Sequence, residues 1–298
     1  MKIPKCRVKL PDIYEQYFLY LEHTREISRA QIIRVRRVLA SLHDYLENSK
    51  LSLANLKIEH LDTFMGEFKV AKTTRRLYRY HVRGFLKYLY TERKVIKKDL
   101  ATLLVGAPLF AQKKPPKFLR PQEMRELFSS LKLETPVGIR TYAMIHLAYS
   151  LGLRPKEIGK ITLDDVSFTR GELTITERKT KNPTILPLPR QTDRAIAAYV
   201  FKARPKTEHR CLFLTHARPH LPLLPGVLNG SIRRAMKEAG LSSTAYWLRH
   251  TYAQNLLLIG RTIYEIKEMM GHQNIQSTQR YLHIDTERMR KVLFDETL

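Results

Sequence analysis

The sequence contains few cysteines and no long hydrophobic segment. Only Cys6 and Cys211 are present among its 298 residues, which argues against a disulfide framework and against a cysteine-based zinc site. No apolar stretch follows Met1, and the longest apolar run, from Leu100 to Phe110, is too short to span a bilayer. We therefore expect a cytoplasmic protein that has no membrane partner.

Acidic residues are also scarce. The chain has 53 Lys and Arg residues against 28 Asp and Glu, a formal charge of +25 and a pI near 10.1. Such an excess predicts a polyanionic partner, and nucleic acid is the first candidate. Because 43% of the residues are hydrophobic, the charge does not indicate disorder, and the chain can bury sizeable cores.

The pattern predicts two domains, covering residues 1–112 and 113–298. Between Val95 and Phe118 the helical periodicity is lost, and three prolines stand beside two pairs of lysines, as is typical of a basic linker. We expect an all-helical first domain and a second domain of mixed α+β structure. The fold class is therefore mainly α with a small β-sheet.

Two helices can be placed in the first domain. Ser28 and Gln31 have the spacing of a capping box. An apolar stripe follows at helical spacing: Ile32, Leu39, Leu42 and Leu46. A second helix is predicted to start at Thr73 or Thr74, with one apolar face formed by Tyr78, Val82, Phe85 and Leu89.

Another face of this second helix carries five cations. They are Lys72, Arg76, Arg79, Arg83 and Lys87. A charge run is usually a solvated face, but acidic partners one turn away are almost absent here. We therefore expect these side chains to contact DNA phosphates.

The second domain mixes helices and strands. Residues 139–151 read as an apolar helix that Gly152 ends, and 172–176 with 184–188 read as a β-hairpin with Lys179 in its turn. Further helices are predicted at 191–203, 231–239, 249–260, 263–270, 277–282 and after Asp285.

Two arginines suit chemistry on a phosphodiester. In-line attack on phosphorus increases the negative charge on the non-bridging oxygens, and guanidinium groups can clamp these oxygens with forked, permanently charged donors. Arg154 and Arg249 are the candidates. A tyrosine can be the nucleophile where nearby groups accept its proton or stabilise its oxyanion, but composition alone does not select one of the 15 tyrosines.

A series of motifs resembles the tyrosine recombinases, the family of phage integrases and Xer-like proteins. The motifs are LGLRPKEIGKITLDDVSF at 151–168, a basic turn before Leu186-Pro187-Leu188, LRHTYAQNLL at 248–257, MMGH at 269–272 and STQRYLHI at 277–284. The resemblance implies a helical core DNA-binding domain and a catalytic domain. It also implies cleavage and rejoining of double-stranded DNA through a 3′-phosphotyrosyl link, without metal, ATP or another cofactor.

The same resemblance assigns roles to further residues. It implies that Tyr281 is the nucleophile and that Lys179 is the general acid, with Lys181 as the fallback. His272 would donate to the scissile phosphate or orient Tyr281, and an ordinary capping or core histidine is the alternative. Glu157 would hold the basic groups in place by charge pairing, and a simple surface glutamate is the alternative.

The sequence departs from the family pattern three residues before Arg249, where it has Tyr246 in place of the usual histidine. A phenol can donate a hydrogen bond to phosphate, but it accepts a proton less readily than imidazole near neutral pH. We expect Tyr246 to contact or position the phosphate. We expect His250, next to Arg249, to have a structural packing role.

Several biological roles are compatible with these motifs. The high charge and Tyr246 favour an integrase or transposase of a mobile element, and a host Xer-like resolvase is the alternative. A catalytically impaired DNA-binding accessory protein of the same descent is a third possibility. The resemblance implies a homotetramer on DNA, with a possible partner recombinase or accessory factor and a nucleoid-associated location.

Overall fold

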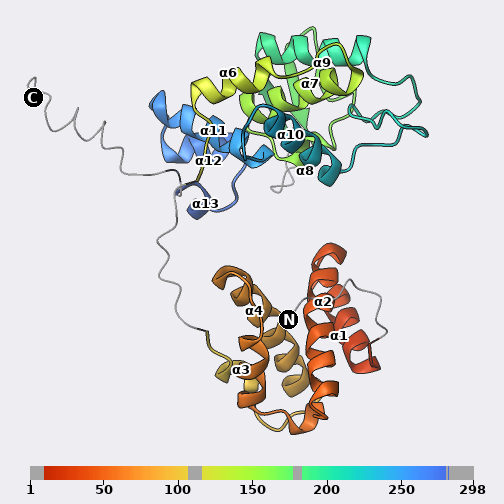
Figure 1. The fold of residues 1–298 in the computed structure, drawn as a ribbon, viewed down its shortest axis with the longest axis vertical. Coiled ribbons are helices and arrows are strands. Elements are labelled where there is room, and N and C mark those ends of the chain that lie inside the picture. The colour runs from red at the N-terminus through yellow and green to blue at the C-terminus, as the bar shows by residue number, and fades with distance from the viewer. Residues whose placement is uncertain (1–9, 107–115, 177–182, 280, 282–298) are drawn as a thin grey trace, which may run out of the picture. The chain divides into compact units, whose positions relative to one another are not determined.

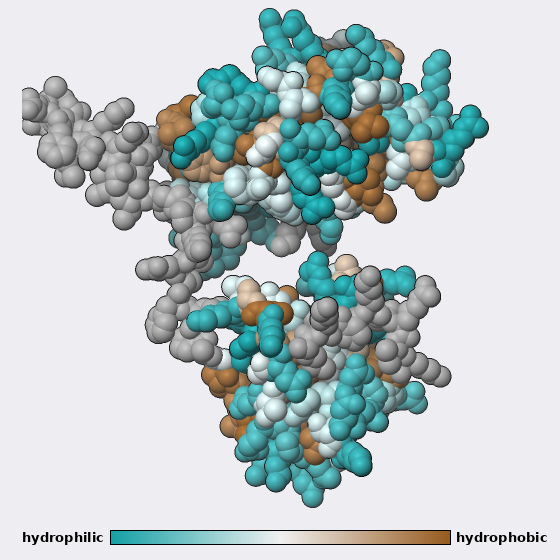
Figure 2. Space-filling view, in the orientation of Figure 1, coloured by the Kyte–Doolittle hydropathy of each residue, from teal (hydrophilic) through white to brown (hydrophobic). Residues whose placement is uncertain are grey.

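In a computed structural model, the chain forms two compact units, Met1–Gln112 and Lys113–Leu298 (Figure 1). The structure describes residues 10–106, 116–176, 183–279 and 281. Each unit has its own hydrophobic core, and the visible surface of each is mostly hydrophilic with scattered hydrophobic side chains (Figure 2). No helix among the described residues is long and apolar enough to cross a bilayer.

The described residues of the first unit form helices and connecting loops and no strand, as predicted. Its elements are α1 (Asp12–His23), α2 (Arg29–Asn48), a 3-10 turn (Leu53–Asn55), α3 (Ile58–Gly66), α4 (Lys72–Thr91) and α5 (Leu100–Leu103). Tyr14 on α1 stacks on Phe85 on α4, with ring centroids 4.7 Å apart. Both rings are fully buried, so aromatic packing joins the first and fourth helices.

The predicted stripe on α2 is confirmed, because Ile32, Leu39, Leu42 and Leu46 are all buried. Ser28 is the N-cap residue, but the predicted capping box is not formed. The Ser28 hydroxyl donates to the Gln31 side-chain oxygen at 3.2 Å and accepts no bond from the helix backbone. The two side chains therefore pair with each other at the exposed start of the helix.

Helix α4 starts at Lys72, one or two residues earlier than predicted, with Ala71 as its N-cap. Its apolar face is confirmed, because Val82, Phe85 and Leu89 are buried and Tyr78 packs against the same core.

The second unit consists of helices around a small sheet. The helices are α6 (Pro121–Ser129), α7 (Pro136–Ser150), α8 (Pro155–Ile158), α9 (Arg190–Lys202), α10 (Pro225–Glu238), α11 (Ala245–Leu258), α12 (Ile263–Met269) and α13 (Gln276–Gln279). Helix α7 is central and packs against α9, α10 and α11 (Figure 1). Its middle residues Met144, Ile145 and Leu147 are completely buried, so almost the whole circumference of this helix is core.

The predicted hairpin is confirmed and extended by a third strand. Strands β1 (Val166–Ser167), β2 (Glu172–Ile175) and β3 (Thr184–Pro187) form an antiparallel sheet in the order β1-β2-β3, with Leu173 opposite Leu186. Alternate residues of β2 are buried, which is the pattern of a strand with one face on the core.

Two helices of the second unit begin at least four residues earlier than predicted. Helix α10 starts at Pro225 and not at 231, and α11 starts at Ala245 and not at 249. A proline at the first helical position needs no hydrogen-bond partner for its nitrogen, so Pro225 can open α10. The hairpin turn with Lys179 and Lys181, and the helix predicted after Asp285, lie outside the described residues.

Candidate active site

The connection between α7 and α8 places Arg154 and Glu157. Gly152 ends α7 with a φ of 62°, and an added Cβ there would collide with the Tyr252 ring, so glycine is required. Arg154 is the N-cap of α8, and its backbone N–H donates to Glu157 Oε2 at 2.8 Å. Its side chain also pairs with the same carboxylate, at 2.6 Å between Nη1 and Oε1. Glu157 therefore fixes both the backbone and the guanidinium of Arg154.

Arg249 approaches the same carboxylate from α11. Its side chain is buried, with Nη1 3.9 Å from Glu157 Oε2. Nη1 also donates to the Gly152 carbonyl, and Nη2 donates to the Met270 carbonyl at 2.6 Å. Glu157 is only 6% exposed, so a buried carboxylate links the two arginines. Two positions were considered for Glu157, one paired with basic groups and one on the surface. The structure places it in the buried, paired position.

The segment after α12 joins the same cluster. Arg154 Nη2 donates to the Gly271 carbonyl at 3.3 Å, next to the Met270 carbonyl that Arg249 contacts. Gly271 has a φ of 59°, a conformation that favours glycine, and His272 follows it. The two arginines therefore also position the loop that carries His272.

Tyr281 is buried at 4% exposure, although it was expected to act on a large external substrate. Its ring packs in a small apolar cluster with Ala253, Leu256, Ile266 and Met270. Its hydroxyl lies 2.7 Å from His250 Nδ1, a hydrogen-bond distance. His250 was expected to have a structural packing role, and the structure adds that its ring nitrogen contacts the candidate nucleophile.

His272 also lies near the Tyr281 ring. The two rings are parallel within 2°, with centroids 6.5 Å apart, and His272 Nδ1 lies 2.8 Å from the hydroxyl of the fully buried Thr278. Thr278 in turn accepts the Tyr281 backbone N–H on its carbonyl at 2.9 Å. His272 and Tyr281 are thus held by one residue.

Tyr246 stands on the first turn of α11 with 51% of its surface exposed. It precedes Arg249 by one helical turn, and its contact with a phosphate stays a prediction. Lys179, the expected general acid, lies outside the described residues.

The cationic face of α4 belongs to the first unit. Lys72, Arg76, Arg83 and Lys87 are exposed and Arg79 is half-buried. Within the described part of the chain, no carboxylate forms an ion pair with any of these five residues. The face therefore has its positive charge available for an anionic partner.

Among the described residues, no three His, Cys, Asp or Glu side chains are grouped closely enough to hold a metal ion. The described cluster contains arginine, glutamate, histidine and tyrosine, which are groups for hydrogen bonding, charge stabilisation and proton transfer.

The chain is similar to known proteins over most of its length. Residues 117–288 match the model of the phage integrase family. A protein of Sinorhizobium fredii with the name "Putative integrase/recombinase y4rA" is 30% identical over 93% of this chain and 68% of its own length. The tyrosine recombinase XerC of Pelotomaculum thermopropionicum is 31% identical over 70% of each chain.

A solved structure shows the same fold. The XerH site-specific recombinase, in a post-cleavage complex with its palindromic difH substrate, superimposes with a TM-score of 0.75. The match covers 94% of this chain and 84% of that chain, at 19% sequence identity.

Proposed function

Because the chain belongs to the phage integrase family of tyrosine recombinases, which are DNA strand-transfer enzymes, we propose that Tyr281 is the residue that cleaves DNA. The observation that supports this most directly is the Tyr281 hydroxyl, which lies 2.7 Å from Nδ1 of His250, the residue directly after Arg249. Arg249 and Arg154 in turn share Glu157.

The proposed reaction exchanges one ester bond for another. Tyr281 Oη attacks phosphorus, its proton passes to a neighbouring acceptor, and the bond from phosphorus to the 5′-oxygen breaks. The products are a 3′-phosphotyrosyl link and a 5′-hydroxyl, which forms on the leaving oxygen with a proton from Lys179. Because an ester bond is retained, the reverse attack by a 5′-hydroxyl rejoins the strand without metal or ATP.

Arg154 and Arg249 have the proposed role of binding the non-bridging oxygens. Some N–H groups of both side chains already donate to Glu157 or to backbone carbonyls. These bonds fix the guanidinium planes before the substrate binds. Glu157 is the positioning residue for both. His272 is proposed to donate to the phosphate or to orient Tyr281.

The family pattern has a histidine at position 246, where this chain has Tyr246. His250 takes over part of the function of that histidine. Its ring nitrogen lies within hydrogen-bond distance of the nucleophile, so it can orient the phenol or accept its proton. Tyr246 is proposed to contact the phosphate from the surface. We expect Tyr246→Phe to slow cleavage of DNA, measured as the rate of adduct formation. Cleavage as fast as that of the parent would remove Tyr246 from the site.

The burial of Tyr281 implies a step before attack. A side chain with 4% exposure must move, or its cover must open, before its hydroxyl reaches a phosphorus atom of external DNA. If Tyr281 must break its contact with His250 in this step, the role of His250 is inhibitory. If the contact is kept while Tyr281 moves, the role of His250 is catalytic.

Double-stranded DNA is the proposed substrate, and the cationic face of α4 is its proposed contact on the first unit. The active assembly is proposed to be a homotetramer on DNA, with a possible partner recombinase or accessory factor, in association with the nucleoid. The excess charge and the presence of Tyr246 are the grounds for proposing a mobile-element integrase in preference to a host resolvase.

The experiment is capture of denaturant-resistant adducts from cells that express the chain or Tyr281→Phe, followed by sequencing of the attached DNA. Adducts from the parent alone support the nucleophile and identify the target site. With the native locus supplied, absence of adducts from the parent supports the non-cutting accessory protein.

A further inference from the structure

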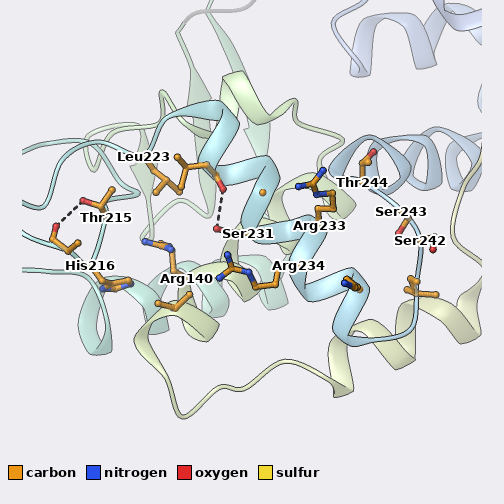
Figure 3. A pocket seen from close by; sticks show the side chains of 16 residues that line it. Arg140, Thr215, His216, Leu223, Ser231, Arg233, Arg234, Ser242, Ser243 and Thr244 are labelled. Atoms are coloured by element: carbon orange, nitrogen blue, oxygen red, sulfur yellow. Dashed lines mark hydrogen bonds between the residues drawn. The ribbon is translucent and has the colours of Figure 1, made fainter. Parts of the chain in front are cut away.

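A large cavity opens in the second unit between α7, α10 and the loop at 215–217 (Figure 3). Its volume is about 1060 Å³. Five of the lining side chains are basic: Arg140, His216, Arg233, Arg234 and Lys237. Figure 3 shows Arg140 reaching from α7, Arg234 from α10 and His216 from the loop toward the same space. Three separate parts of the fold therefore bring basic groups together.

The positive charge in this cavity is not balanced by the protein. No aspartate or glutamate is among the described lining residues. Across the described part of the chain, no carboxylate pairs with any of the four lysine and arginine side chains. Like charges around one space repel each other, and a bound anion offsets this cost.

Arg140 is the least expected of these residues, because it is 5% exposed. Its Nη1 donates to the Leu214 carbonyl at 2.6 Å, but its Nε has no hydrogen-bond partner among the described residues. Burial lowers the pKa of this guanidinium. Buried arginines normally have an anionic partner, so Arg140 at the wall of an open cavity indicates that the partner comes from outside the chain.

His216 supports the same conclusion. Its Nε2 is buried and has no hydrogen-bond partner within the described structure. Hydroxyl groups of Ser242 and Thr244 add neutral donors along the cavity wall. Forked guanidiniums with hydroxyl donors are the combination that recognises phosphate oxygens.

We propose that this cavity binds phosphate groups at a site separate from the reaction centre. None of the residues proposed to act on the scissile phosphate lines it; the lining stops at Thr244, two residues before Tyr246. The volume exceeds that of one phosphate, so the cavity has room for linked phosphates or for a phosphate on a larger body. The source is the DNA backbone away from the cleavage point or a free phosphorylated compound, and only the first source rests on the proposed function.

The test is an NMR titration of the full chain with pyrophosphate, read at the backbone amides of Ser243 and Thr244. Arg140 is buried and its removal perturbs the fold, so the variant is Arg234→Gln, at an exposed position of α10. Arg194→Gln, at an exposed position of α9, is the control with the same change of charge. We expect saturable shifts at these amides, with binding weakened about tenfold by Arg234→Gln and unchanged by Arg194→Gln.

A second arm identifies the source of the phosphate. Weaker duplex DNA binding by Arg234→Gln, with competition between DNA and pyrophosphate at Ser243 and Thr244, assigns the site to the DNA backbone. Unchanged DNA binding assigns it to a free phosphorylated compound. The proposal is overturned if these amides do not shift, or if Arg234→Gln and Arg194→Gln bind pyrophosphate with equal affinity. Failure of Tyr281 to form adducts would not affect this result.

Discussion

Replacing Glu157 by glutamine tests whether one buried carboxylate organises both arginines. The change keeps the shape of the side chain and one acceptor oxygen, but it removes the negative charge that lies 2.6 Å from Arg154 and 3.9 Å from Arg249. Breaking a buried ion pair by removing one partner costs about 3 to 5 kcal/mol, and glutamine retains part of the hydrogen bonding, so we expect a loss of about 3 kcal/mol. The guanidiniums also lose their fixed orientation.

The chain contains a matched control for this variant. Arg120, Pro121 and Glu123 repeat the Arg-Pro-x-Glu pattern at the start of α6, where Glu123 Oε2 accepts the Arg120 backbone N–H at 2.6 Å. Glu123→Gln therefore removes a similar helix cap, worth about 1 kcal/mol, without disturbing two buried arginines. The difference between the two variants isolates the pairing with the arginines.

The assays are thermal unfolding and cleavage of a nicked duplex that traps the covalent product. At about 2 to 4 °C per kcal/mol for a unit of this size, Glu157→Gln should lower the melting temperature by roughly 6 to 12 °C, and Glu123→Gln by a third of that. Cleavage by folded Glu157→Gln should fall about 10- to 100-fold, while Glu123→Gln stays at the parent rate. Equal effects of the two variants on both readouts would refute the positioning role.

Three further predictions concern single side chains. His250→Phe should reduce the rate of cleavage about 100-fold without changing DNA affinity, because the Tyr281 hydroxyl loses its partner at 2.7 Å. His209→Phe, at an exposed position, is the control. Equal cleavage rates of the two variants would leave His250 with a packing role. Burial lowers the pKa of His146 to about 4, so the folded protein keeps this ring neutral while the unfolded chain protonates it near pH 6.5. The contribution of His146 to the free energy of unfolding is therefore complete above pH 6.5 and decreases by about 3 kcal/mol as the pH falls to 4. His146→Phe should make the free energy of unfolding in urea less dependent on pH over this range. A pH dependence parallel to that of the parent contradicts the assignment. Arg83→Gln should lower the slope of log DNA affinity against log salt by about one, whereas Lys50→Gln should not change it, and equal slopes would exclude Arg83 from the phosphate contacts.

Helix positions with strong periodicity could be predicted from the sequence. The stripe of α2 and the apolar face of α4 depend on local spacing, and every residue of both patterns packs in the core. Helix starts were less accurate. Pro225 opens α10 six residues before the predicted start, because Gly226, Asn229 and Gly230 have a low helix propensity and hide the first turns of this helix in the sequence.

The candidate site shows the limit of local patterns more clearly. The motif containing Arg249 and the motif containing Tyr281 are visible in the sequence, but the contact between His250 and Tyr281 joins positions 31 residues apart. Adjacency to Arg249 was the only available signal for His250. The cluster of basic residues around Arg140 was also not predicted, because it combines α7, α10 and a loop, and no spacing rule relates these segments.

The most direct test of the central claim is mass spectrometry of the adduct formed on a nicked duplex. The account predicts a single phosphotyrosyl peptide containing Tyr281, attached to the 3′ end of the cleaved strand, and a free 5′-hydroxyl on the released strand. An adduct at another tyrosine, a link to the 5′ end, or an undiminished adduct from Tyr281→Phe would contradict it.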